Sequence, residues 1–87
     1  MERRRVDSCA FRRRVVTIAP DDWHAFVDSE WDDSLVVVER GDIELYCSAT
    51  VRRFAQGAML WFSGLGLRAL HNPGVEDTVL VALSRRC

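Results

Sequence analysis

The sequence predicts an all-β fold, and three observations support that class. Six short segments are rich in β-branched residues or alternate apolar with polar residues, as strands do. Turn-favouring residues, namely Gly, Pro, Asn and Asp, interrupt the apolar pattern between these segments. The segments also recur at intervals of roughly ten residues, which is typical of small β-sandwiches and barrels.

The expected strands follow one another along most of the chain. The first is β-branched, the second is a continuous apolar run, and the third alternates apolar and polar side chains. Gly41, followed by Asp42, separates the second from the third as a tight hairpin turn does. The window 21–31 has apolar residues at helical spacing, but it is too short for three helical turns, so we prefer a strand there. The six expected strands are 13–19, 34–39, 42–49, 58–62, 67–71 and 78–84.

The chain has 87 residues, which is the size of one domain. We expect an Arg-rich N-terminal arm at 1–12 and a single β domain at 13–87. The arm is either a solvated tail that runs into an edge strand or an anion-binding segment. Because so small a domain buries only about 60% of its unfolded surface, stability favours a partner subunit, and we expect a homodimer.

Charge and cysteine usage exclude several classes of protein. The formal net charge of -1 argues against a domain-wide nucleic-acid or membrane surface. There is no apolar run of about 18 to 20 residues and no secretory leader pattern, so the expected location is cytoplasmic. Cys9, Cys47 and Cys87 form no CxxC pair, which argues against a disulfide framework or a thiolate zinc site. Cys47 lies in an alternating apolar run and is expected in the core, whereas Cys87 has no expected role.

Two weak motifs give the order of these segments a family resemblance. From Gly57, the chain can be laid on a pattern Gly-x5-Pro-x-Gly-x2-His-x3-Asn, with Ser63 at the proline, Leu65 at the second glycine, Arg68 at the histidine and Asn72 at the asparagine. This arrangement resembles the second motif of the cupin superfamily, and VVVERGDIEL is similar to the hairpin that follows that family's first motif. The spacing between Gly41 and Gly57 is that of compact bacterial cupins. The resemblance covers about residues 15–84 and implies a small double-stranded β-helix, or jelly-roll, barrel.

The resemblance also implies where a metal would bind, and the residues present depart from it. Anchored on Gly41, the first motif places Asp28 and Glu30 at its two histidines and Ser34 at its glutamate. Arg68 stands at the fourth ligand position, where a guanidinium cannot donate a lone pair and repels a cation. We therefore expect no metal and no cofactor. Arg68 and the carboxylates form either a buried ion pair or a ligand site in which Arg68, Asp28, Glu30, Ser34, Trp61 and Asn72 contact the bound molecule.

The imidazoles and the large aromatics have competing explanations. His24 follows Trp23 in a polar turn and is expected to be exposed, although His24 and Glu30 are the candidates for moving a proton. His71 is expected at a strand end on the opposite side from Arg68, because side chains alternate along a strand. The aromatic residues either fill the core and a subunit contact or line a hydrophobic pocket; they are Trp23, Phe26, Trp31, Trp61 and Phe62.

The leading hypothesis from the sequence is a metal-free small cupin that binds a small anionic or aromatic molecule or acts as an accessory protein. The first alternative is a metal-independent isomerase, epimerase or cyclase that uses an Arg and carboxylate pocket. The second is a structural interaction module. The fold by itself does not choose between them, because one scaffold can host many functions. An open interior favours ligand chemistry, and a filled interior favours the module.

Overall fold

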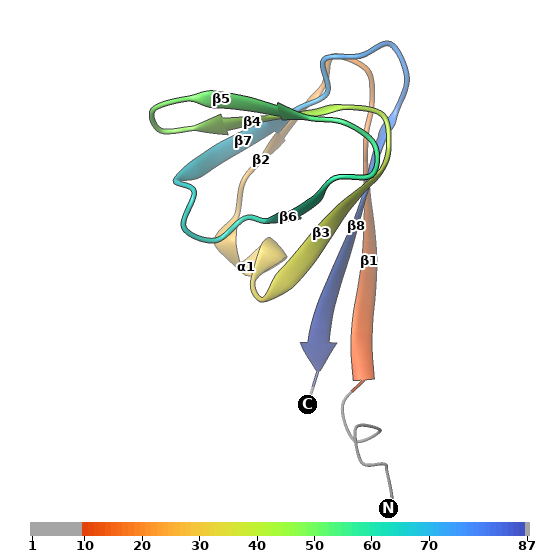
Figure 1. The fold of residues 1–87 in the computed structure, drawn as a ribbon, viewed down its shortest axis with the longest axis vertical. Helices are drawn as coiled ribbons and strands as arrows, with labels where there is room; N and C mark the ends of the chain where they lie inside the picture. The colour runs from red at the N-terminus through yellow and green to blue at the C-terminus, as the bar shows by residue number, and fades with distance from the viewer. Residues whose placement is uncertain (1–9, 87) are drawn as a thin grey trace, which may run out of the picture.

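The computed structural model describes residues 10–86 and contains eight strands and one short helix within that range (Figure 1). Helix α1 has four residues, and no helix in the described range is long and apolar enough to span a membrane. The elements are β1 (Ala10–Ile18), β2 (Trp23–Ala25), α1 (Asp28–Trp31), β3 (Ser34–Arg40), β4 (Ile43–Cys47), β5 (Val51–Phe54), β6 (Met59–Trp61), β7 (Leu67–His71) and β8 (Thr78–Arg86).

The strands form two four-stranded antiparallel sheets, in the orders β1-β8-β3-β6 and β2-β7-β4-β5. Four of the pairings are nested, from the outermost strands to the central ones: β1 pairs with β8, β2 with β7, β3 with β6, and β4 with β5. This is a long hairpin wrapped on itself, which is the topology of a jelly roll. The described strands of one sheet do not pair with those of the other, so the sheets form an open sandwich and the expected closure into a barrel is not seen.

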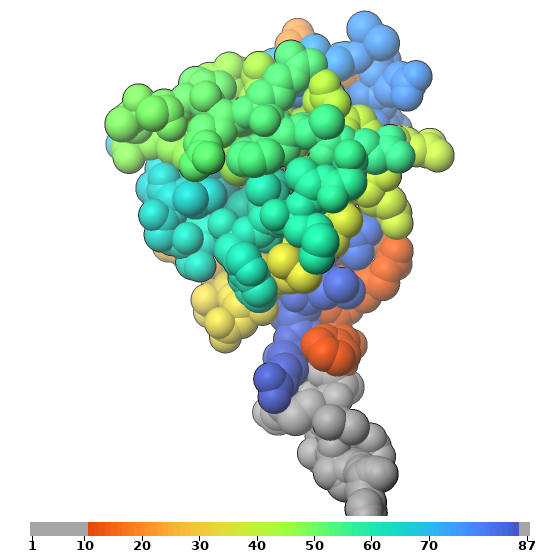
Figure 2. Space-filling view, in the orientation of Figure 1, coloured from red at the N-terminus to blue at the C-terminus, as the bar shows by residue number. Residues whose placement is uncertain are grey.

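The core lies between the facing sides of the two sheets. Val36, Val38 and Leu80 project inward from the first sheet, and Leu45 and Leu70 project inward from the second; all five are 0% exposed. In the ribbon, β5 and β6 are separated by a gap, but side chains fill this region in the space-filling view (Figures 1 and 2). The buried cluster comprises Ile18, Trp31, Val36, Val38, Ile43, Leu45, Leu60, Phe62, Leu67, Leu70, Leu80 and Ala82.

All six expected strands are present, and the structure differs from the expectation mainly at three places. Strand β1 begins at Ala10, so residues 10–12 of the expected arm belong to the sheet, while 1–9 lie outside the described residues together with Cys87. The window 21–31, which we assigned to a strand, forms β2 and then turns into α1. Strand β5 was not expected. Cys47 packs against the core as expected.

Strand β7 contains an irregularity that reverses the predicted direction of one side chain. Ala69 pairs with Tyr46, but Leu67 pairs with Cys47, so Arg68 is an extra residue opposite the β4 strand. A bulge of this kind breaks the alternation of faces along a strand. Leu67 and Leu70 are both buried as a result, and Arg68 is exposed.

Candidate functional site

The four residues at the cupin ligand positions do not converge. Arg68 and Asp28 are exposed. Ser34 is only 6% exposed, and its hydroxyl donates to the carbonyl of Asp32 at 3.2 Å. The expectation that Arg68 lies inside, among Asp28, Glu30 and Ser34, is therefore wrong. The bulge in β7 directs the Arg68 side chain to solvent instead.

Two further residues of the expected ligand site also have other surroundings. Trp61 is 57% exposed and lies on the outer side of its sheet, because its direct partner Leu35 is on that side. Asn72 is fully buried and is committed to the backbone. Its amide donates to the carbonyls of Ile18 (2.9 Å) and Glu76 (2.7 Å) and accepts from the N–H of Gly74 (2.9 Å). Asn72 is thus a structural residue of the 72–77 turn.

Glu30 and His24, the candidates for proton transfer, do meet. His24 Nε2 lies 2.9 and 3.1 Å from the two carboxylate oxygens of Glu30. Arg14 Nη1 lies 3.1 Å from Glu30 Oε2, and its second terminal nitrogen donates to the Glu30 carbonyl. Arg14, which lies in the expected strand 13–19 and had no predicted role, completes this group. With Trp31, whose ring lies 5.0 Å from the Arg14 guanidinium carbon, these residues are called the Glu30 cluster.

Each side chain of the Glu30 cluster is positioned by a different element. Arg14 is paired with Ala82, which is 3% exposed, so Arg14 projects from β1 into the space between the sheets. His24 is paired with the buried Leu70 and projects into the same space from β2. Glu30 comes from α1, between β2 and β3 (Figure 1). The cluster therefore bridges both sheets.

The hydrogen bonding fixes the tautomer of His24. An ionised carboxylate only accepts hydrogen bonds, so Nε2 carries the proton that points to Glu30. Nδ1 of His24 has no hydrogen-bond partner among residues 10–86. In the neutral ring, Nδ1 then carries the lone pair and can accept a proton or a hydrogen bond.

The Glu30 cluster is part-exposed on one side and has a buried polar atom on the other. The side chains of Arg14, His24 and Glu30 are 35%, 32% and 23% exposed. Trp31 is 3% exposed, and its indole N–H has no acceptor among the described residues. Buried donors in folded proteins almost always have a partner, which can be a water or a ligand.

The donor set does not fit a divalent cation. Glu30 is held by Arg14, and a guanidinium beside the carboxylate opposes a second positive charge. Within residues 10–86, no three His, Cys, Asp or Glu side chains are grouped so that they could hold a metal ion. His71 does contact two carboxylates, but through its two ring nitrogens, so these oxygens lie on different sides of the ring.

A second polar group, the His71 cluster, lies on the outer side of the sheet β2-β7-β4-β5. His71 Nδ1 is 2.8 Å from Glu44 Oε1, and Nε2 is 3.0 Å from Asp21 Oδ1. The imidazole packs on the Trp23 ring, with 4.3 Å between the ring centroids. The Trp23 ring also packs against the Tyr46 ring, with 4.7 Å between their centroids. His71 lies at the end of β7, as expected, but its side chain is only 12% exposed.

The hydrogen bond with Glu44 raises the pKa of His71 above its ordinary value of 6.5. Burial opposes this rise, and the bond with Asp21 adds to it. Because both carboxylates can only accept, the protonated imidazole satisfies both bonds at once. Desolvation, followed by the neighbouring Glu44, raises the pKa of Tyr46. The His71 cluster is thus internally paired, with its donors and acceptors facing one another.

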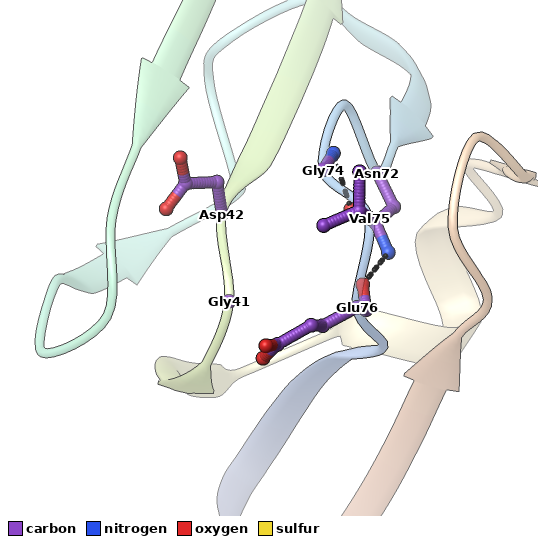
Figure 3. A pocket seen from close by; sticks show the side chains of 6 residues that line it. All are labelled: Gly41, Asp42, Asn72, Gly74, Val75 and Glu76. Carbon is purple, nitrogen blue, oxygen red and sulfur yellow. Dashed lines mark hydrogen bonds between the residues drawn. The ribbon is translucent and has the colours of Figure 1, made fainter.

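A small hollow lies where the β3–β4 turn faces the 72–77 loop (Figure 3). Its volume is about 180 Å³, below the range of roughly 300 to 1,000 Å³ that is usual for ligand pockets. The side-chain amide of Asn72 is hydrogen-bonded to Gly74 and Glu76 of the loop itself. The carboxylate of Asp42 accepts a hydrogen bond from Arg53 Nη2 at 2.6 Å. The hollow therefore offers few free polar groups. It is lined by Gly41, Asp42, Asn72, Gly74, Val75 and Glu76.

Comparison with known proteins supports the fold. No protein-family model matches the chain, and no curated protein matches it. Among solved structures, the chain is similar to a Cupin 2 conserved barrel domain protein from Salinispora arenicola CNS-205, with a TM-score of 0.61 and 20% sequence identity. The aligned region covers 84% of this chain and 60% of the Salinispora protein, so this chain spans less than two thirds of the length of that protein. The cupin resemblance is confirmed as a resemblance of fold.

Proposed function

We propose that this chain is a metal-free, small-molecule-binding protein of the cupin fold, and that its ligand binds at the Glu30 cluster. The observation that carries the proposal is the convergence of Arg14, His24 and Glu30 from three elements into the space between the sheets. Partly exposed polar groups that converge beside an apolar core are the usual composition of a ligand site.

The hydrogen-bonding capacity of the cluster indicates the class of ligand. Glu30 offsets the charge of Arg14, so the group is close to neutral when the His24 ring is neutral. His24 Nδ1 offers one hydrogen-bond acceptor. The guanidinium of Arg14 has five N–H donors; two of its nitrogens donate to Glu30, and the remaining N–H groups can donate to a ligand. A small molecule that carries a hydroxyl or a carboxylate fits these hydrogen-bonding groups.

A second candidate function is supported by the contact between His24 and Glu30. A carboxylate that orients an imidazole through one nitrogen leaves the other nitrogen able to act as a general base. In a metal-independent isomerase, epimerase or cyclase, His24 Nδ1 would remove the proton and Glu30 would be the positioning residue. Apolar side chains fill the centre of the sandwich, and a filled interior favours the third possibility, an interaction module. The Glu30 cluster lies at the partly exposed margin of that core, where a ligand can still bind.

Native mass spectrometry of the freshly purified protein, followed by a thermal-shift panel of small carboxylic acids, phenols and sugars, tests ligand binding. We expect a retained or stabilising molecule whose effect is lost in Arg14→Met and in His24→Gln. The matched control is Arg53→Met, because Arg53 forms an ion pair of the same kind with Asp42 on the outer side. A stabilising molecule that is unaffected by the first two substitutions contradicts this site.

The enzyme candidate has a separate measurement. If His24 removes a proton from carbon, the stabilising molecule exchanges that hydrogen with deuterium in ²H₂O, and His24→Gln abolishes the exchange. Glu30→Gln removes the carboxylate that orients the imidazole, so it should lower the exchange rate without abolishing it. Binding without any exchange supports the non-enzymatic function.

A further inference from the structure

The outer side of the sheet β1-β8-β3-β6 is apolar across all four strands. Residues that pair directly across an antiparallel sheet lie on the same side, so the register defines this surface. Val36 and Leu80 point inward, which places Val37 and Val81 outward. We call the outward set the outer apolar face. Its first row is Val15, Val81, Val37 and Met59, and its second is Leu83, Leu35 and Trp61, bordered by Arg13.

The same side of the other sheet is built differently. There, one row across the strands carries Trp23, His71, Glu44 and Arg53, in which polar side chains are paired with one another. Antiparallel sheets normally have one side in the core and a polar side in water. The sheet β2-β7-β4-β5 follows this rule in the row through His71, although its next row, Ala25, Ala69, Tyr46 and Val51, is largely apolar. The sheet β1-β8-β3-β6 has apolar residues on its outer side in both of the rows named above. The outer apolar face is therefore expected to be covered.

The exposed area on this face is of the size that a dimer contact needs. Phe11 lies beyond the second row, on the same side of β1 as Arg13 and Val15 because side chains alternate along a strand. Phe11 is 73% exposed, Met59 64%, Trp61 57% and Val15 46%. A fully buried aromatic side chain covers roughly 150 to 250 Å², so Phe11 and Trp61 together expose roughly 200 to 300 Å². Met59 and Val15 bring the exposed apolar surface to about 400 Å². Interfaces are roughly 60% apolar, so a contact built around this patch covers about 700 Å² per partner, against about 800 Å² in a standard interface.

We propose that the outer apolar face is the contact surface of a homodimer, in which a second copy of the chain packs the same four strands face to face. The same surface on both copies can be buried in a closed assembly only by a two-fold axis. The net charge of -1 leaves little repulsion between copies. A rim of both signs, with Arg13 at one end of the face and Glu39 and Arg40 at the other, fits an arrangement in which the strands of the two copies run in opposite directions.

Sedimentation velocity of the full chain, between about 1 and 100 μM, tests the proposal with a matched pair of variants. Val15→Glu places a charge on the outer apolar face, and Val51→Glu places the same charge on the outer side of the other sheet, where Val51 is 53% exposed. We expect a wild-type species of twice the 10.0 kDa chain mass. Val15→Glu is expected to raise the dimer dissociation constant by at least about 30-fold, which is the effect of losing a hot-spot residue, and Val51→Glu to leave it unchanged.

Oxidative footprinting of the wild type supplies a readout that does not depend on whether a variant folds. Trp61 lies on the proposed contact and Trp23 does not, and their exposures are similar, at 57% and 52%. Hydroxyl-radical labelling of Trp61 should fall several-fold with rising protein concentration, while that of Trp23 stays constant. A monomer at 100 μM overturns the proposal. So does a dimer that survives Val15→Glu, that dissociates in Val51→Glu, or that is lost only when residues 1–9 are removed.

Discussion

His71 is joined to Glu44 across the β4–β7 pairing, with Nδ1 of the imidazole 2.8 Å from the carboxylate. The other ring nitrogen holds Asp21, which lies in the connection between β1 and β2. A single protonated ring therefore ties the β1–β2 turn to the sheet β2-β7-β4-β5. This arrangement has a direct consequence for how stability depends on pH.

We predict that stability declines when the pH rises above about 6.5. The bond with Glu44 raises the pKa of His71 in the folded state, so the protonated ring contributes stability fully below the unfolded pKa. That contribution is lost as the pH rises through the folded pKa. Urea midpoints measured between pH 5.5 and 9 should fall over this range in the wild type. The fall should be smaller in His71→Gln and in Glu44→Gln, and an equal fall in all three proteins contradicts the assignment.

Gly41 is predicted to be the least replaceable glycine among the described turns. Its φ is +79°, and an added Cβ would lie 2.9 Å from the backbone oxygen of Asp77 and from the Thr78 hydroxyl oxygen. Gly64 has nearly the same φ, +78°, but open space around it. Gly64→Ala should cost about 1 kcal/mol of unfolding free energy for the left-handed backbone. Gly41→Ala should cost at least about 1 kcal/mol more by denaturant unfolding, and equal costs would show that the contact relaxes freely.

Asn72→Ala is predicted to destabilise the protein by about 2 to 4 kcal/mol. The substitution removes three hydrogen bonds from a fully buried side chain, each worth roughly 0.5 to 1.5 kcal/mol. Because Asn72 acts on the backbone, ligand retention per folded molecule should be unchanged. If Asn72→Ala is as stable as the wild type but no longer retains the ligand, Asn72 is a ligand-binding residue and this prediction is wrong.

Arg68→Met is predicted to change the unfolding free energy by less than about 0.5 kcal/mol, because the side chain is exposed. Arg14→Met removes the hydrogen bonds to Glu30 and the contact with the Trp31 ring. After allowance for partial exposure, its cost should be about 1 kcal/mol. Guanidinium chloride titrations of both variants check the difference, and a larger loss in Arg68→Met would contradict the bulge in β7.

The strands were predictable where period-two patterns and β-branched runs reflect burial, as in β3 and β8. Strand β5 was missed because Val51–Phe54 contains Arg52 and Arg53 in succession and lies at a sheet edge, where apolar alternation is not required. The 21–31 window was ambiguous because its first apolar residues lie in strand β2 and its last one, Trp31, lies in helix α1.

The site was less predictable, because it depends on a bulge and on long-range contacts. The motif resemblance placed Arg68 at an interior ligand position, and one extra residue in β7 turns its side chain to solvent. Glu30 and His24 were identified singly as candidates, but their contact follows from the turn into α1. Arg14 could have been found from its period-two spacing to Ile18, a buried residue of β1. The partners of His71 lie elsewhere along the chain, Glu44 on β4 and Asp21 in the β1–β2 connection, and only the register of β4 with β7 brings Glu44 beside His71.

The wrapped pairing of the strands also determines the order in which the chain can close. β4 and β5 are neighbours along the chain, whereas β1 and β8 are its ends, so their pairing carries the largest loop-closure entropy. We expect folding in milliseconds to seconds, with the β4–β5 region formed in the transition state and β1–β8 completed afterwards. Leu45→Ala should then slow folding, and Leu80→Ala, equally buried, should mainly speed unfolding in chevron measurements. The centre of the chain sets how fast the protein forms, and its two end strands set how long the folded state lasts.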